Sequence, residues 1–441
     1  MFHEKIKALF SSAVDSVAST ISKYSVHPDK DFTRQKKLPP DKLITFLVSQ
    51  GSSSTSEELL EFFDLDADAP SVSALNQQRA KLKPEAMEAV FHHFHSSLSS
   101  LEGADGYESI AADGSTFSFF SKPTFASPDY FVSEGHSAKG FYSLHLNALY
   151  NLDKHIYTDA LIQPIHNKDE YRAFATLVDR HQTSPWKKTI FIGDRGYCSY
   201  NNMAHVLKKG QFFLFRAKDI HSKGLLSGFD FPDKESFDIR VRVTLVRSQS
   251  KKIAVEGYRR FVDKATSFDF IEYGTRDTYQ LTFRIVRFPI SESTYECLVT
   301  NLPEEEFPPK RLKELYFSRW GVESSFRKLK YTIGLIHFHS YKPDFVKQEI
   351  WAKLIVYNLT ESIINHTAVV HQKKTKHDYK IHFGTAAHIC RVFLRPSVKE
   401  GSINVTALLQ RRLIPIRNER QYHRLKTAHF RRPRYLIYRA A

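Results

Sequence analysis

The sequence predicts an α/β protein organised around a mixed β-sheet, with a helical region before it and a helical, basic region after it. Between about residues 101 and 218, short apolar runs typical of strands alternate with helical patterns. From 219 to 302, strict alternation of apolar and polar residues indicates a β-rich segment. The length of 441 residues favours two to four domains, and a hydrophobic content of 41% is ample for a core.

The first of these regions, residues 1–100, is expected to be helical. Pro40 begins one helical pattern, a Ser/Thr cap with an acidic first turn begins a second near residue 55, and Ser73 is a candidate cap for a third. The third helix carries polar amides and basic side chains of the kind that read DNA bases, so the three helices resemble a helix-turn-helix unit. A plain helical bundle explains the same residues, which are Asn76, Gln77, Gln78, Arg79, Lys81 and Lys83.

Residues 101–218 are expected to form the first part of a catalytic core. An apolar strand is expected to end at Asp113-Gly114, and two β-rich runs follow at 140–152 and 155–165. A helical pattern at 168–181, a strand before Asp194, a helix near 200–208 and a strand at 211–218 complete the series. Three strands followed by helix, strand, helix and strand is the order of an RNase H-like mixed sheet.

The remaining regions are expected to be a β-rich insertion at 219–302, the second part of the core at 303–375 and a basic C-terminal region at 376–441. From Arg411 to Ala441 there are ten Arg and Lys residues and one acid, Glu419, interleaved with aromatic residues. A basic tail is often just solvated, but basic and aromatic residues together suit a phosphate backbone.

A helix predicted at residues 309–331 carries four chemically active side chains on one face. Tyr316, Arg319, Glu323 and Lys330 fall within an arc of roughly 60° at about 100° per residue. Apolar residues at helical spacing allow the same helix to pack against a core. Taken alone, Arg319 with Glu323 and Glu323 with Arg327 are also explained as solvated i,i+4 pairs.

Two aspartates occur where strands are expected to end. Asp113 lies in AADGSTF and Asp194 in FIGDRGY. Asp113 beside Gly114 also suits a simple turn. If Glu323 packs nearby, three carboxylates meet, and such a cluster calls for cations. Oxygen ligands suit Mg²⁺ or Mn²⁺, and two such ions activate a water or a sugar 3′-hydroxyl for phosphoryl transfer on DNA.

Composition and charge indicate which classes of binding partner to expect. A formal charge of +16 implies a polyanion, most often nucleic acid, with a membrane surface as the weaker alternative. No apolar run is long enough to span a bilayer, no signal peptide is recognised, and three scattered cysteines fit a reducing cytoplasm. The histidine groups at 92–95 and 337–339 lack partners at metal-ligand spacing, and Cys198 lacks a clear base.

The motifs AADGSTF, GDRGY and Y-x2-R-x3-E-x6-K, in this order with a β-rich insertion between the second and third, resemble bacterial insertion-sequence DDE transposases. More narrowly, they resemble the family-four group with the Y-R-E-K signature, over about residues 32–341. The resemblance implies that Asp113, Asp194 and Glu323 bind two Mg²⁺ or Mn²⁺ ions. It further implies DNA contacts: phosphates for Arg319 and Lys330, the cleavage site for Tyr316, and an additional phosphate for Arg195. For Arg195, an ion pair with the neighbouring carboxylate of Asp194 is the alternative.

The same resemblance implies hydrolytic nicking at the element ends, then attack of the freed 3′-hydroxyl on target DNA. The expected partners are double-stranded transposon-end and target DNA and a second copy of the chain in a synaptic homodimer, in a bacterial, nucleoid-associated setting. Relatives that excise through a DNA hairpin hold a flipped base against an aromatic residue, in some a tryptophan of the insertion. Residues 219–302 contain no tryptophan, so the excision route stays open, with Tyr258, Tyr273 or Tyr279 as substitutes. An inactive DNA-binding descendant and a metal-dependent nuclease are the alternatives.

Overall fold

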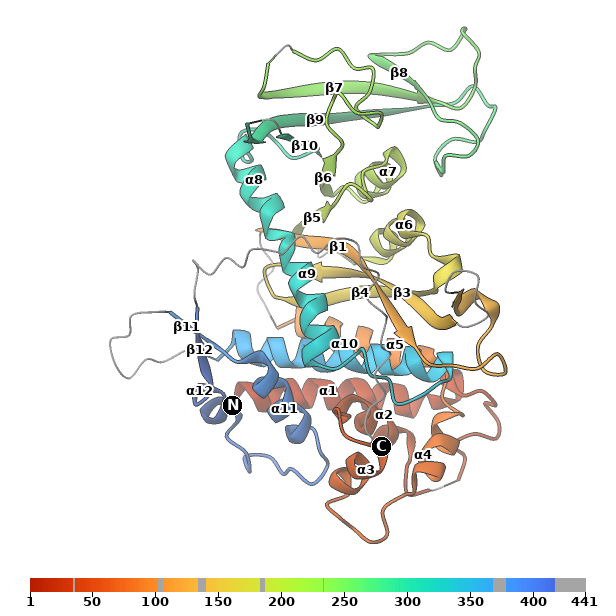
Figure 1. The fold of residues 1–441 in the computed structure, drawn as a ribbon, viewed down its shortest axis with the longest axis vertical. Helices are drawn as coiled ribbons and strands as arrows, with labels where there is room; N and C mark the ends of the chain where they lie inside the picture. The colour runs from red at the N-terminus through yellow and green to blue at the C-terminus, as the bar shows by residue number, and fades with distance from the viewer. Residues whose placement is uncertain are drawn as a thin grey trace.

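A computed structural model describes residues 1–34, 36–101, 106–133, 140–182, 187–232, 234–292, 294–367 and 378–416. Its centre is a mixed sheet with the strand order β2-β3-β1-β5-β6-β10-β9-β7-β8, and β4 pairs with β3 beside β2 (Figure 1). A mixed α/β architecture around one large mixed sheet, as predicted, therefore underlies the chain.

Five strands form the part of the sheet that the sequence assigned to the core. They are β1 (Gly106–Phe119), β3 (Gly140–Asn151), β4 (Ile156–Pro164), β5 (Lys187–Gly193) and β6 (Phe212–Ala217). β3 runs antiparallel to β1 and β4, whereas β1, β5 and β6 are parallel. The short strand β2 (Phe131–Ser133) adds to the outer edge of β3. The predicted order of three strands, helix, strand, helix and strand is observed, and it fits an RNase H-like transposase core.

The prediction that the first strand ends at Asp113 is wrong, because β1 continues to Phe119. The ladder between β1 and β5 ends earlier, at the Ala111–Ile192 pair, while the pairing of β1 with β3 continues to Phe119. Asp113 is therefore in mid-strand, just beyond the point where β1 loses its partner on one side. Because β5 no longer pairs with β1 at this point, Asp113 lies at an open edge of the sheet, as it would at the predicted strand end.

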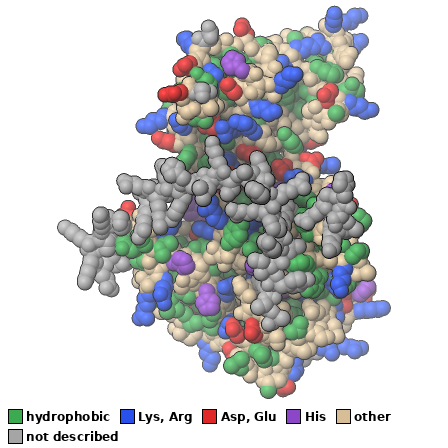
Figure 2. Space-filling model, in the orientation of Figure 1, with side chains coloured by type: hydrophobic (Ala, Val, Ile, Leu, Met, Phe, Trp, Pro, Cys, Tyr) green, Lys and Arg blue, Asp and Glu red, His purple; other side chains and the backbone are tan. Residues whose placement is uncertain are grey.

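The β-rich segment extends the same sheet. Antiparallel pairing joins β10 (Thr294–Thr300) to β6, and β9 (Thr278–Ser291) lies next to β10. β7 (Phe237–Val246) and the edge strand β8 (Tyr258–Phe261) follow. On the face shown in Figure 2, Lys and Arg side chains gather over this upper part of the molecule.

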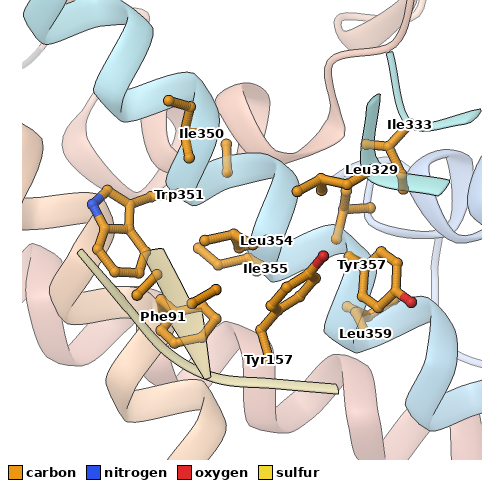
Figure 3. Packing of buried hydrophobic residues seen from close by; sticks show 14 of the residues in the cluster. Phe91, Tyr157, Leu329, Ile333, Ile350, Trp351, Leu354, Ile355, Tyr357 and Leu359 are labelled. Atoms are coloured by element: carbon orange, nitrogen blue, oxygen red, sulfur yellow. The ribbon is translucent and has the colours of Figure 1, made fainter. Parts of the chain in front are cut away.

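Helices cover the two faces of the sheet with different partners. On one face, α6 (Glu170–Arg180) and α7 (Tyr200–Lys208) pack into a cluster with Phe191, Phe213 and Phe215. On the other face lie α5 (Pro84–Ser99), α9 (Trp320–Arg327) and α10 (Pro343–Asn365). α10 is buried along most of its length, because α1 (Phe2–Ser19), α2 (Pro40–Ser49) and α5 surround it together with α11 (Phe383–Phe393). Figure 3 shows this packing around Trp351, Leu354 and Tyr357.

The predicted helices of the N-terminal region are present, with one correction. Ser54 caps α3 (Thr55–Phe62) in a capping box, and Ser71, not Ser73, caps α4 (Val72–Arg79). Arg79 is 2% exposed and bonds Glu349, Gln348 and the Phe345 carbonyl of α10. It is unsuited to reading DNA, because its guanidinium is used to hold α4 against the core. Asn76 and Gln77 remain exposed.

The predicted signature helix is a nearly continuous helical run. It consists of α8 (Pro309–Ser318), α9 and a π-helical turn, η4 (Lys328–Thr332), with Arg319 in helical conformation at the first junction. The chain ends with α11, α12 (Val405–Gln410) and a small sheet of β11 (Tyr379–Ile381) and β12 (Leu413–Pro415). Four short helical turns complete the described elements: η1 (Ile21–Tyr24), η2 (Pro128–Tyr130), η3 (Ile165–Asn167) and η4. Most of the predicted basic tail, residues 417–441, lies outside the described residues.

Candidate active site

Asp113 projects from β1 toward the face of the sheet that α9 covers. Burial raises the pKa of its carboxyl group to about 6, and the charges of Asp194 and Glu323 act in the same direction. A bond from the Gly114 N–H to Oδ1 at 2.8 Å and the charge of Arg319 oppose this shift. The three predicted carboxylates, far apart in the sequence, therefore lie close enough to influence one another.

Asp194 follows β5 directly, as predicted, and begins a tight turn. The Gly196 N–H donates to its Oδ1 at 2.7 Å, and the Tyr197 N–H donates to its carbonyl at 3.1 Å. A side chain at Gly193 would lie 2.7 Å from Cβ of Tyr197, so the turn closes only with glycine before the aspartate. Arg195, the next residue in the chain, is exposed.

The signature run supplies the third carboxylate and two cations. Nη2 of Arg319 lies 2.8 Å from Oε1 of Glu323. Lys330 is half-buried, and its Nζ lies 4.9 Å from the ring centre of Phe117 on β1. Burial lowers the pKa of Lys330, while the charge of Asp113 counteracts this. The two basic residues thus lie at the carboxylates, where they partly neutralise them.

Tyr316 lies deeper than a simple DNA contact would require. It is 5% exposed, and burial raises the pKa of its hydroxyl. The charges around it include Arg319, Arg216 and Glu296. Tyr316 therefore also has a packing role, between the signature run and strands β6 and β10.

Two residues at this site were not found from the sequence. His145 of β3 is 3% exposed, and its Nε2 lies 3.3 Å from Oε1 of Glu170, at the start of α6. The imidazole occupies the space above Gly114, where a Cβ would lie 2.4 Å from Nε2. Burial raises the pKa of the Tyr197 hydroxyl, and the charges of Asp113, Glu170 and Asp194 all raise it further. Nothing in KDEYRAF marks Glu170 as different from any acid in a first helical turn.

The donor set suits a hard divalent cation, although the carboxylates are not arranged as a finished metal site. Within the described part of the chain, no three His, Cys, Asp or Glu side chains are grouped to hold a metal ion. Arg319 provides the positive charge at Glu323, whereas at Asp113 burial raises the pKa of the carboxyl group by more than the charge of Arg319 lowers it. Three carboxylates offer only oxygen ligands, and the charge of Asp113 is only partly compensated, which fits Mg²⁺ or Mn²⁺.

The histidine groups and Cys198, which the sequence also singled out, have surroundings that fit structural residues. His339 is 3% exposed, between Glu58 at 3.2 Å and Glu349 at 3.2 Å. His92 lies beside Glu88 and Asp159. Burial raises the pKa of the Cys198 thiol to about 12, which makes it a poor nucleophile. Among the described residues, no helix is both long enough and apolar enough to cross a bilayer.

Comparison with known proteins agrees with these site features. Residues 105–359 match the family described as Transposase DDE domain, and that range includes all three carboxylates. The Escherichia coli K12 transposase InsG of insertion sequence element IS4 is 35% identical over 82 residues, which are 18% of this chain and 19% of that protein. The transposase for insertion sequence element IS421 of Escherichia coli is 33% identical over 82 residues, 18% of this chain and 22% of that protein. The chain thus matches only about a fifth of the length of these relatives.

A synaptic complex of piggyBac transposase with hairpin DNA overlaps 91% of this chain and 83% of that one, with a TM-score of 0.43 and 8% identity. A TM-score this low supports no conclusion about this chain. The family match covers more than half of the sequence, and the resemblance to insertion-sequence transposases is confirmed at that level, while the narrower Y-R-E-K group stays a prediction. The chain belongs to the transposase DDE domain family, with relatives among the transposases of bacterial insertion sequences.

Proposed function

We propose that this chain is a metal-dependent DNA transposase that cuts the ends of an insertion sequence and joins them to target DNA. The observation that carries the proposal is that Asp113, Asp194 and Glu323, far apart in the sequence, lie near one another in a chain of this family. Three acids that share one site favour the binding of divalent cations.

In this proposal Asp113, Asp194 and Glu323 hold two Mg²⁺ or Mn²⁺ ions. When bound, such ions lower the pKa of a water or sugar hydroxyl and stabilise the leaving oxygen of a phosphodiester. The residues around them bind and orient the DNA. Arg319 and Lys330 are donors suited to phosphate oxygens, and Arg195 is exposed beside Asp194, which leaves it accessible to a further phosphate.

In this scheme Glu323 and a DNA phosphate compete for the guanidinium of Arg319. Its guanidinium bonds Glu323 at 2.8 Å and its side chain is 7% exposed. Cations at the carboxylates would compensate Glu323 and release Arg319 for a phosphate. Tyr316, at the same junction, contacts the end DNA only if this part of the signature run opens, because it is 5% exposed.

The partners follow from charge and from the chemistry. A net charge of +16 supports binding of double-stranded DNA, as transposon end and as target. Joining two ends calls for two copies of the chain, so a synaptic homodimer is part of the proposal. The helical region 1–100 would recognise the ends, and the segment 219–302 and the basic region 376–441 would hold the DNA against the two core parts, 101–218 and 303–375.

The test uses a plasmid that carries the gene with its natural flanking DNA, a second plasmid as target, and the purified chain with Mg²⁺. Nicks at the element borders and joined products are expected. Cuts without joined products would favour a nuclease, and binding without cuts an inactive descendant. Asp113→Ala, Asp194→Ala and Glu323→Ala should each abolish cutting while DNA binding persists; parallel loss of binding would overturn the assigned roles.

A further inference from the structure

The outward face of the signature run carries a regular row of exposed side chains. Spaced four, three, four, three and four residues apart, they form what we call the outer stripe: Lys313, Phe317, Trp320, Ser324, Arg327 and Tyr331. Three of the six are aromatic, and these are 73%, 49% and 68% exposed in chain order. Large aromatic side chains lose the free energy of burial when they face water, so a row of them marks a binding surface.

The outer stripe lies next to the candidate catalytic residues around the helix axis. If the run is treated as one regular helix, the stripe covers an arc of roughly 80° that begins about 20° from Tyr316, on the side away from Arg319. Buried Val322, Phe326 and Leu329 lie on the opposite side of the catalytic arc. A strand that leaves the carboxylates therefore passes directly onto the stripe.

The composition of the outer stripe indicates which kind of ligand it suits. Lys313 and Arg327 are basic, no member is acidic, and the guanidinium of Arg319 lies 5.6 Å from the ring centre of Trp320. Interleaved aromatic and basic side chains are what unpaired nucleotides need, because every base offers a π-face and every phosphate a charge. Duplex DNA keeps its bases stacked inside and cannot use the rings. A second copy of the same stripe would bring like charges together.

We propose that the outer stripe binds single-stranded DNA beside the cut, with bases stacked on Phe317, Trp320 and Tyr331 and phosphates held by Lys313 and Arg327. This inference rests on the proposed DNA chemistry of the same run. From Trp320 to Tyr331 the run rises by roughly 16 Å, the length of several nucleotides in one strand. The stripe would keep the unpaired segment away from the carboxylates and in a fixed path.

The test is a binding titration without divalent ions, so that no cutting occurs. The probes are a fluorescein-labelled oligo(dT), an oligonucleotide of equal length with abasic sites, and a duplex of equal length. Phe317→Ala/Tyr331→Ala should weaken oligo(dT) binding about tenfold or more while changing duplex and abasic binding little. Phe317→Tyr/Tyr331→Phe, which keeps both rings, should retain wild-type binding.

Phe125→Ala is the matched control, because that ring is 46% exposed and lies outside the regions 1–100, 219–302 and 376–441 that are proposed to bind DNA. It should leave all three probes unaffected. Lys313→Ala/Arg327→Ala should weaken oligo(dT) and abasic binding together and reduce the salt dependence of both. Circular dichroism and thermal midpoints verify that the variants fold.

Equal loss on all three probes, or no loss on oligo(dT), would overturn the inference. A change in sedimentation with unchanged oligo(dT) binding would instead assign the stripe to a protein partner. These results are separate from the proposed function. If the wild-type chain cuts and joins element ends while the ring variants bind normally, only the stripe is wrong, and if it never cuts, the stripe is still tested by binding.

Discussion

Nη2 of Arg319 and Oε1 of Glu323 lie 2.8 Å apart, one helical turn from each other on the signature run. The pair places a guanidinium beside Glu323, where the proposed chemistry needs a metal ion. The negative charge of the neighbouring Asp113 is only partly compensated. The arginine thus acts as an internal counter-ion of the cation-free chain. In the proposed function, release of Arg319 would couple the loading of cations to the binding of a DNA phosphate.

This coupling predicts that divalent cations stabilise the chain. Mg²⁺ or Mn²⁺ should raise the thermal midpoint relative to NaCl of equal ionic strength, because a ligand that binds only the folded state stabilises it by mass action. Asp194→Asn should remove most of this shift. Arg319→Ala should enlarge it, because Glu323 then lacks its internal cation. Equal shifts in all three proteins would show that the cations act elsewhere.

Gly114→Ala should destabilise the fold by about 1–3 kcal/mol, the usual cost of overpacking. The added Cβ would lie 2.4 Å from Nε2 of His145, which is buried and contacts Thr116 as well. His145→Ala should relieve the clash, so the double variant should be less destabilised than the sum of the single changes. Urea denaturation of the four proteins measures the coupling. Additive effects would mean that His145 does not limit the space at Gly114.

Arg79→Ala should cost about 3–5 kcal/mol, because it breaks a buried ion pair and leaves His339 to compensate the charge of Glu349. Both side chains are 2% exposed, and the pair joins α4 to α10. Asn76→Ala on the exposed face of α4 is the control: it should leave the free energy of unfolding nearly unchanged. If Asn76→Ala weakens binding to element-end DNA, α4 reads DNA through its exposed face, and Arg79 serves only the fold.

Arg79 also shows what sequence reasoning could and could not supply. A run of amides and basic residues is the same in sequence whether it faces DNA or a buried helix, and Glu349 lies 270 residues away. Asp194 was placed correctly because strand, turn and glycines are local signals. Asp113 was found by its motif, but its position in mid-strand depends on where the β5 ladder stops, which is a long-range property. His145 and Glu170 come together only through the pairing of β1 with β3 and the packing of α6.

The region 219–302 illustrates the same limit. Alternation of polar and apolar residues predicted strands, but it carries no information about the sheet they join. The antiparallel pairing of β10 with β6 continues the core sheet into this region. The outer stripe was likewise not recognised from the sequence, because Phe317 and Tyr331 look like core residues until the burial of Val322 and Leu329 fixes the inner face.

Glu349 predicts part of the acid sensitivity of the fold. The charges of His339 and Arg79 and hydrogen bonds from His339 outweigh burial and lower the pKa of its carboxyl from 4.5 to about 2. Because the folded pKa lies below the unfolded one, the ionised form contributes stability above about pH 4.5, and this stability is lost as the pH falls toward 2. The contribution is about 3 kcal/mol at neutral pH. Replacing the pair by Arg79→Met/Glu349→Met should therefore flatten the dependence of the unfolding free energy on pH between 4.5 and 2, as measured by urea denaturation at fixed ionic strength. An unchanged slope would mean that other carboxylates account for the acid sensitivity in this range.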